Sequence, residues 1–108
     1  MKIDKVFVIN LEHRTDRKNA IITELKRVGI TNYEFFKAIQ PTEQMIATWN
    51  PNFINPLPEW LKHNNCDKTK YKIGALGCML SHIEIIKKCI ENKYENVLIL
   101  EDETIFKI

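Results

Sequence analysis

The sequence has little net charge, no long apolar run and few cysteines. Its 16 Lys and Arg against 14 Asp and Glu give a formal net charge of +2, so it lacks the basic field that attracts nucleic acid, and we expect no nucleic-acid partner. No apolar run approaches the roughly 18 residues that span a bilayer, and the first residues lack the apolar segment of a signal peptide. We therefore expect no transmembrane segment and a cytoplasmic location.

The cysteine content excludes a disulfide framework. Cys66, Cys78 and Cys89 are odd in number and widely spaced, which fits free thiols in a reducing compartment. With 108 residues and 44% hydrophobic content, the chain can build one core. Residues 1–108 are therefore expected to form a single domain, or part of one.

The first 39 residues show the pattern of a strand, a helix and a second strand. Residues 5–11 form an apolar, β-branched run, as in a strand buried on both faces of a parallel sheet. Thr15 is a candidate N-cap for a helix with apolar residues at positions i, i+4 and i+7, and Gly29 suits the positive-φ position that ends it. Residues 33–39 resume an extended pattern. This order predicts a βαβ unit.

The rest of the chain contains an irregular segment, a helix and a strand. Residues 40–72 include all four prolines and are expected to form a long irregular loop within the domain. Helical periodicity then returns, in a helix that opens at residues 73–77 and runs to about Asn92. Its predicted core-facing stripe consists of Met79, Ile83, Ile86 and Ile90. Residues 97–100 are purely apolar, as in a central strand.

These elements predict an α/β fold whose polar residues gather at one sheet edge. In open α/β sheets, ligands bind outside the carboxyl ends of the strands. The segment from Asn10 to Arg17 leaves the first strand there, and Glu101 to Glu103 leave the last. The helix opening with Gly74 is expected at the same edge, because a crossover helix runs antiparallel to the strands that it joins.

A diphosphate with a divalent metal would unite these features. Carboxylates are the ligands that Mg²⁺ or Mn²⁺ prefers, and both ions keep positions open for phosphate oxygens. Arg14 and Arg17 offer charge-assisted donors to phosphate, and a glycine at a helix start lets backbone N–H groups approach an anion. Each feature also has a plain structural alternative: solvated acidic turn residues, surface arginines, and glycines such as Gly74 and Gly77 that only allow close packing.

Three sequence blocks resemble glycosyltransferase family 25. They are VINLEHRTDRK from Val8, with Asn10, Arg14 and Arg17; GALGCMLSH from Gly74, with Ser81 and His82; and VLILEDE from Val97. Their order and spacing agree with the family over almost the whole chain. The resemblance implies a GT-A type, Rossmann-like fold, of which this chain would be a truncated, N-terminal portion.

The resemblance also implies a function and roles for the matched residues. It implies a transferase of lipopolysaccharide biosynthesis, or of collagen hydroxylysine glycosylation, that transfers a hexose from a UDP-sugar to a glycan or hydroxylated acceptor, usually with Mn²⁺ or Mg²⁺. Arg14 and Arg17, with Asn10 and Gly74 beside them, would bind the nucleotide-sugar, and Ser81 and His82 would lie beside the donor site. Glu101, Asp102 and Glu103 match the family's Glu-Asp-Asp metal motif, with Glu103 replacing the usual second Asp.

No residue of this sequence can be nominated as the general base. The family continues beyond its acidic motif, and the later part is expected to supply acceptor contacts and that base. We therefore expect a donor-binding half, and a non-catalytic fragment that binds nucleotide or a partner chain is a second possibility.

A zinc-binding module is a further alternative from another class. The spacing H-x2-C-x11-C-x3-H superficially fits a four-ligand zinc site. Its ligands would be His63, Cys66, Cys78 and His82. The alternative requires Cys78 and His82 to face a loop while the neighbouring apolar stripe of the same helix packs on a sheet.

Overall fold

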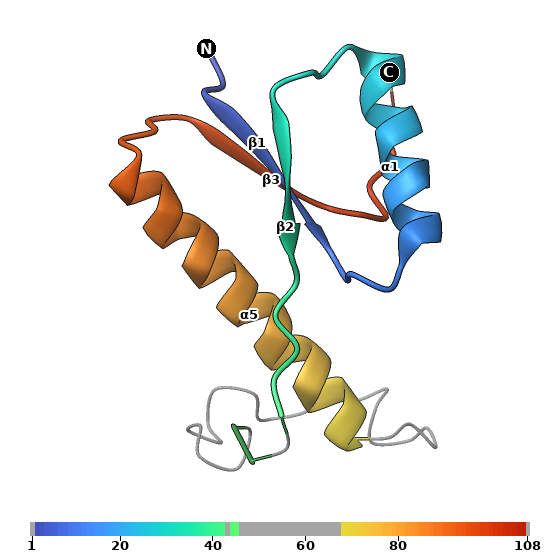
Figure 1. Cartoon of the computed structure of the whole chain (residues 1–108), viewed down its shortest axis with the longest axis vertical. Coiled ribbons are helices and arrows are strands. Elements are labelled where there is room, and N and C mark those ends of the chain that lie inside the picture. The colour runs from blue at the N-terminus through green and yellow to red at the C-terminus, as the bar shows by residue number, and fades with distance from the viewer. Residues whose placement is uncertain (1, 43, 46–67, 108) are drawn as a thin grey trace. The chain divides into compact units, whose positions relative to one another are not determined.

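A computed structural model describes residues 2–42, 44, 45 and 68–107 of the chain (Figure 1). The elements follow in the order β1 (Lys5–Asn10), α1 (Thr15–Val28), β2 (Tyr33–Lys37), α5 (Lys68–Glu91) and β3 (Val97–Glu101). They belong to two compact units. Residues 1–38 and 81–108 make up one, and residues 39–80 make up the other.

The three strands form one parallel sheet in the order β2-β1-β3. Val8 pairs with Phe35 on one side and with Leu100 on the other. This arrangement confirms the predicted α/β class and the Rossmann-like βαβ sheet. The continuous apolar run of β1 fits its central position, because a strand flanked by two neighbours is buried on both faces.

The sheet reverses its direction of growth next to β1. The chain leaves β1 for β2 on one side and then crosses back to place β3 on the other side. Such a reversal is a topological switch point, and it opens a crevice at the carboxyl ends of the strands on either side of it. Here these strands are β1 and β3, which end at Asn10 and Glu101.

Alternate residues of the strands build a core on each face of the sheet. One core joins Val6, Val8 and Leu100 to Ile21 and Leu25 of α1. The other core joins Phe7 and Ile9 to Ile85 of α5, with Cys89 packed against it. The helices α1 and α5 therefore cover opposite faces of the sheet.

Helix α1 agrees closely with the sequence pattern. It begins at Thr15, with Arg14 in the N-cap position and no side-chain cap, so the predicted N-cap is wrong by one residue. Gly29 ends the helix with φ of 79°, a left-handed conformation that an L side chain rarely adopts.

Helix α5 corrects two predictions. It begins at Lys68, five positions before the predicted opening at Ile73, so the last five residues of the expected 40–72 loop are helical. Residues 43 and 46–67 of that loop lie outside the described residues. The predicted buried stripe is also wrong at two of its four positions, because Ile86 and Ile90 are 52% and 72% exposed while Ile85 is fully buried. Met79 and Ile83 are half-buried.

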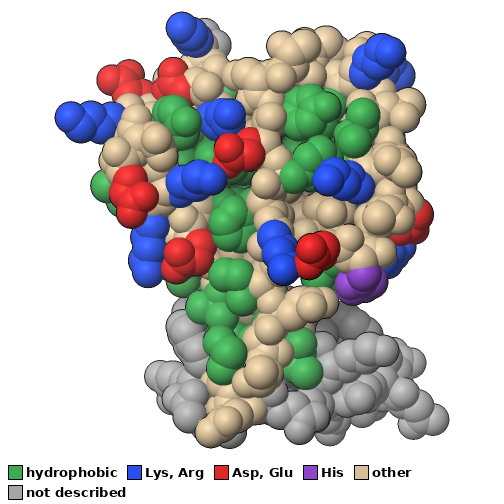
Figure 2. Space-filling view, viewed as in Figure 1, with side chains coloured by type: hydrophobic (Ala, Val, Ile, Leu, Met, Phe, Trp, Pro, Cys, Tyr) green, Lys and Arg blue, Asp and Glu red, His purple; other side chains and the backbone are tan. Residues whose placement is uncertain are grey.

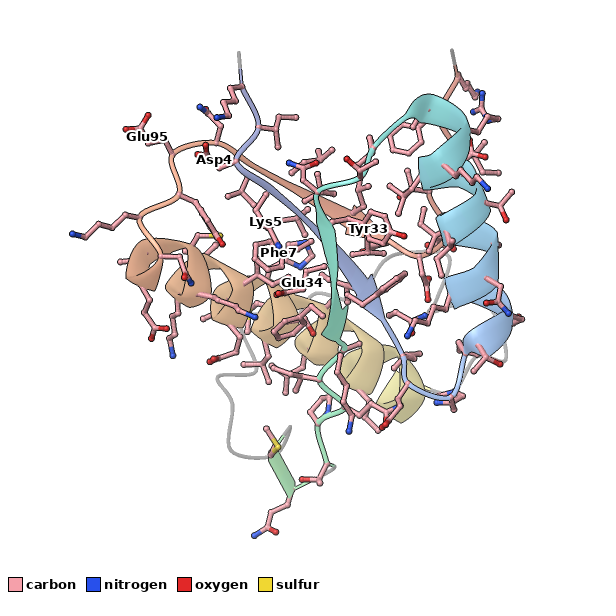
Figure 3. All side chains as sticks on the ribbon, turned by 45° about the horizontal axis from the view of Figure 1, so that its top comes forward. Asp4, Lys5, Phe7, Tyr33, Glu34 and Glu95 are labelled. Carbon is pink, nitrogen blue, oxygen red and sulfur yellow. The ribbon has the colours of Figure 1, made fainter. Side chains whose placement is uncertain are left out.

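Asp4 joins the amino ends of β1 and β3 by hydrogen bonds. Its carboxylate accepts hydrogen bonds from the backbone N–H groups of Glu95 (2.8 Å) and Asn96 (2.9 Å). Figure 3 shows Asp4 beside Glu95 at the start of β1 and β3. These bonds lower the pKa of Asp4 because they stabilise the charged carboxylate, and the bond from Asn96 has the largest effect.

The unit of residues 39–80 contains a close contact at Gly77. A Cβ at this position would lie 2.5 Å from the carbonyl oxygen of Ile39 and 3.1 Å from Cδ of Pro41. Gly74 has open space around it. Gly77 thus allows backbone to approach α5 closely, which is the packing role considered for these glycines.

Several observations concern the thiols and the surface. Cys78 and Cys89 are free thiols, as expected, and Cys66 lies outside the described residues. Among the helices described, none is long and apolar enough to cross a membrane. Lysine, arginine and acidic side chains are interspersed on the face shown in Figure 2.

Candidate functional site at the carboxyl edge of the sheet

A buried hydrogen bond joins the ends of β1 and β3. The side-chain amide of Asn10 donates to Asp102 Oδ2 at 2.9 Å, although the two residues are 92 positions apart. Asn10 is 7% and Asp102 is 8% exposed. The pair therefore lies at the switch point between β1 and β3, where α/β proteins bind their ligands.

Arg17 faces the other oxygen of the same carboxylate. Its Nη1 lies 3.5 Å from Asp102 Oδ1 and 3.8 Å from Glu103 Oε2. The Arg17 side chain is 40% exposed, whereas that of Asp102 is only 9% exposed. The first turn of α1 therefore presents a solvent-accessible guanidinium next to a nearly buried carboxylate, which confirms that Arg17 and Asp102 share one edge of the sheet.

Glu101 is set apart from the other two acidic residues. Leu98 and Leu100 pack on the α1 side and Ile99 on the α5 side, so alternation places Glu101, the last residue of β3, on the α5 side. Asp102 and Glu103 follow the strand, and both lie within 4 Å of Arg17. Glu101 and Glu103 are exposed and Asp102 is buried. Within the described residues, no group of three His, Cys, Asp or Glu could hold a metal ion. A cation bound here would thus use Asp102 with few other protein ligands, in place of all three carboxylates.

Arg14 already has a carboxylate partner. Its Nε and Nη2 donate to the two oxygens of Asp16, both at 3.0 Å. These bonds, together with one from the backbone of Arg17, lower the pKa of Asp16 to about 2, since they stabilise the charged form. The Asn10 amide, which donates to Asp102, also donates to the backbone carbonyl oxygen of Arg14 at 3.3 Å. The backbone of Arg14 is therefore fixed at the site, while its guanidinium pairs within the first turn of α1.

A hollow lies on the β2 side of Asn10. It is lined by Asn10, Glu12, Thr15, Lys18, Phe35, Phe36 and Lys37. Lys18 Nζ lies 4.8 Å from the centre of the Phe35 ring, and Lys37 Nζ forms an ion pair with Glu12 at 2.8 Å. The pairing with Lys37 lowers the pKa of Glu12 by stabilising its charged form. An aromatic ring and two ammonium groups thus adjoin the residue that binds Asp102.

The sequence interpretation included the segment from Asn10 to Arg17 but missed the part of this hollow that β2 and Lys18 contribute. A usable signal was present, because Phe36 and Lys37 lie at the carboxyl end of β2, which also belongs to the ligand-binding edge. In register, Lys37 pairs with Asn10. The sequence interpretation used the ends of the first and last strands and the helix opening with Gly74, and it left out the end of the second strand.

Gly74, Ser81 and His82 all lie on α5. Gly74 is the seventh residue of the helix, so its N–H points to the carbonyl four residues earlier and is not one of the unpaired groups of a helix start. The backbone N–H of Gly74 therefore lacks the free position at a helix start from which it was expected to bind an anion. Ser81 is fully buried and His82 is half-buried, and both have polar partners. Their place beside a donor stays a prediction.

Comparison with known proteins places these residues in a family. The sequence matches glycosyltransferase family 25 (LPS biosynthesis protein) over residues 3–108. The chain belongs to this family. The resemblance to this family is thereby confirmed, and the family consists of sugar transferases.

Several curated relatives match nearly the whole chain. A glycosyltransferase 25 family member of Aedes aegypti is 29% identical over 107 residues, and procollagen galactosyltransferase 2 of Mus musculus is 27% identical over 109 residues; each match covers 99% of this chain. A procollagen lysyl hydroxylase and glycosyltransferase of Acanthamoeba polyphaga mimivirus is 31% identical over 119 residues, covering 96% of the chain. These matches span 17%, 17% and 12% of the relatives' own lengths.

Proposed function

We propose that this family 25 chain forms the donor side of a glycosyltransferase site and binds a UDP-sugar at the carboxyl edge of its sheet. The proposal is carried by the contact of Arg17 with Asp102 at the switch point between β1 and β3. A cation and a carboxylate at such a crevice suit a ligand that carries both phosphates and a bound metal ion.

Each part of the donor has a chemically suitable neighbour. Arg17 would donate charge-assisted hydrogen bonds to the diphosphate. The uridine would lie in the hollow, where Phe35 offers a ring and where Lys18 and Lys37 offer donors. Asn10 borders the hollow and also contacts Asp102. A single nucleotide could therefore occupy the hollow with its phosphates near Arg17.

The donor set fits a divalent cation with one protein carboxylate. Mg²⁺ sites commonly combine one or two carboxylates with substrate phosphates and water. Asp102 would hold Mn²⁺ or Mg²⁺, which, when bound, neutralises the charge of the leaving UDP. Arg17 provides a second positive charge at the same place, so the protein itself stabilises charge on the diphosphate.

Membership in the family supports a proposal for the acceptor and for the class of transfer. In such a transfer, an acceptor hydroxyl would attack the anomeric carbon as the bond to UDP breaks. A glycan or hydroxylysine-type acceptor fits this chemistry, and the procollagen names of two relatives agree with a hydroxylated acceptor. We assign no general base among the described residues.

The decisive experiment is calorimetric titration of the purified chain with UDP, with and without Mn²⁺. We expect binding that depends on Mn²⁺ and is largely lost in Asp102→Asn, which keeps the size of the side chain but removes its charge. Glu101→Gln is the matched control and should retain binding, because alternation directs it to the other face of the sheet. Equal UDP affinity in wild type and Asp102→Asn would contradict the cation role.

Two other functions are tested by separate measurements on the same purified chain. A non-catalytic nucleotide-binding fragment would bind UDP but would release no sugar from a UDP-sugar when supplied with an acceptor. A zinc module would purify with stoichiometric zinc. Of its four proposed ligands, His63 and Cys66 lie outside the described residues, so metal analysis of the purified chain is the direct test.

A further inference from the structure

Asn10 connects the carboxyl ends of all three strands. Its amide Nδ2 donates to Asp102 Oδ2 after β3 and to the carbonyl of Arg14 before α1. Its backbone carbonyl accepts the N–H of Ala38, directly after β2, at 2.9 Å. Among the described residues, one residue at the end of the central strand thus contacts the segments that follow β2 and β3 and the segment that precedes α1.

The chemistry at this position requires a neutral donor of defined length. A carboxylate at position 10 would repel Asp102 at the observed 2.9 Å separation. A serine hydroxyl would be too short to reach Asp102, and an aliphatic side chain would leave Oδ2 without its partner. A buried polar atom without a partner is costly, so Asp102 would then turn toward water or toward Arg17.

We propose that Asn10 is a positioning residue that holds Asp102 Oδ2 and thereby directs Oδ1 toward the bound cation and diphosphate. This inference rests on the proposed donor-binding function. The amide fixes one oxygen in a buried bond, while the other oxygen lies 3.5 Å from Nη1 of Arg17, whose side chain is 40% exposed. Asn10 therefore acts through Asp102, and it need not touch the donor phosphates.

In metal sites generally, some residues do not touch the metal but hydrogen-bond to a residue that does, as we propose for Asn10 and Asp102. Such partners orient the ligating group, and their loss typically weakens metal binding by about 10- to 100-fold. Loss of the Asn10 amide should therefore weaken the binding of UDP with Mn²⁺ by about tenfold or more, while Asp102 itself remains in the chain.

The test uses the whole 108-residue chain with Asn10→Leu, which preserves size but removes the donor. Binding of Mn²⁺ alone, and of UDP with Mn²⁺, is measured by calorimetry at a temperature where circular dichroism shows each variant to be folded. If Asn10→Leu does not fold, Asn10→Ser replaces it. Asn32→Leu is the matched control, because the Asn32 amide also donates to a backbone carbonyl, that of Ile3 at 3.1 Å, at the opposite edge of the sheet.

A spectroscopic readout locates the bound cation, and the affinities of the folded variants separate positioning from stability. In wild type, Mn²⁺ should broaden the side-chain amide signals of Asn10 in a ¹H–¹⁵N spectrum and leave those of Asn32 sharp. We expect the folded Asn10 variant to lose affinity about tenfold and the Asn32 variant to match wild type. If the folded Asn10 variant binds as wild type does, the positioning role is overturned and the proposed donor-binding function is not. If wild type binds no UDP with Mn²⁺, the proposed function falls as well.

Discussion

Arg17 reaches from the first turn of α1 to the acidic end of β3, with its Nη1 3.5 Å from Asp102 Oδ1. The same atom lies 3.8 Å from Glu103 Oε2. A cation in the first helical turn is opposed by the helix dipole, so an anion beside it is favourable. Without a ligand, the carboxylates of Asp102 and Glu103 supply this negative charge beside Arg17. A bound diphosphate would add to it.

Replacing Arg17 by Gln should weaken UDP binding by about 10- to 100-fold, because hydrogen bonds to charged groups contribute about 1.5–3 kcal/mol. Calorimetric titration with UDP and Mn²⁺ measures the change. Arg27→Gln is the matched control, since Arg27 lies in the last turn of the same helix and pairs with Glu24. Equal losses in the two variants would show that Arg17 contributes only to general surface charge.

The burial of neighbouring residues on α5 predicts a sharp contrast in stability. Ile85→Ala should lower the free energy of unfolding by about 2–5 kcal/mol, because it removes a fully buried side chain from the core with Phe7 and Ile9. Ile86→Ala should change it by less than about 0.5 kcal/mol, because Ile86 is 52% exposed. Urea denaturation compares the two. A larger loss at Ile86 would restore the stripe expected from the sequence.

This contrast shows which features local patterns can predict. The βαβ unit could be predicted because β1 is a continuous apolar run and Gly29 ends α1, and both signals act within a few residues. The buried face of α5 could not, because apolar residues lie on several sides of this helix and the buried Ser81 interrupts the apolar pattern. Helical periodicity alone therefore predicted that Ile86 and Ile90 are buried and missed the burial of Ile85.

The candidate site was predictable in part for a similar reason. The topology of a parallel sheet brings strand ends to one edge, which correctly joined Arg17 to Asp102. The bond between Asn10 and Asp102 depends on which strand lies next to β1, and no local pattern encodes this neighbour. Strand alternation also sets Glu101 apart from Asp102 and Glu103, although the three consecutive carboxylates suggested a single cluster.

The ion pair of Arg14 and Asp16 predicts a pH dependence at low pH. The pKa of Asp16 is lowered from 3.8 to about 2, so this pair stabilises the fold above about pH 4 and loses that contribution as the pH falls toward 2. An NMR titration of the Asp16 carboxyl should show a midpoint near 2, and Arg14→Gln should raise it toward 3.8.

Asp4 provides the internal control for that titration. Its pKa is also lowered, but by backbone N–H groups of Asn96 and Glu95, so Arg14→Gln should leave its midpoint unchanged. If the Asp16 midpoint also stayed the same in Arg14→Gln, the ion pair would not be the cause of its low pKa.

The two glycines of α5 predict opposite responses to the same substitution. Gly77→Ala should destabilise the chain by about 1–3 kcal/mol, because the new Cβ would lie 2.5 Å from the carbonyl oxygen of Ile39 and backbone would have to shift. Gly74→Ala has no atom within 4 Å of the new Cβ, so it should stabilise the helix by up to about 1 kcal/mol through higher helix propensity. Thermal unfolding of the two variants side by side measures the difference. A melting temperature for Gly77→Ala at or above that of Gly74→Ala would mean that backbone does not pack against Gly77.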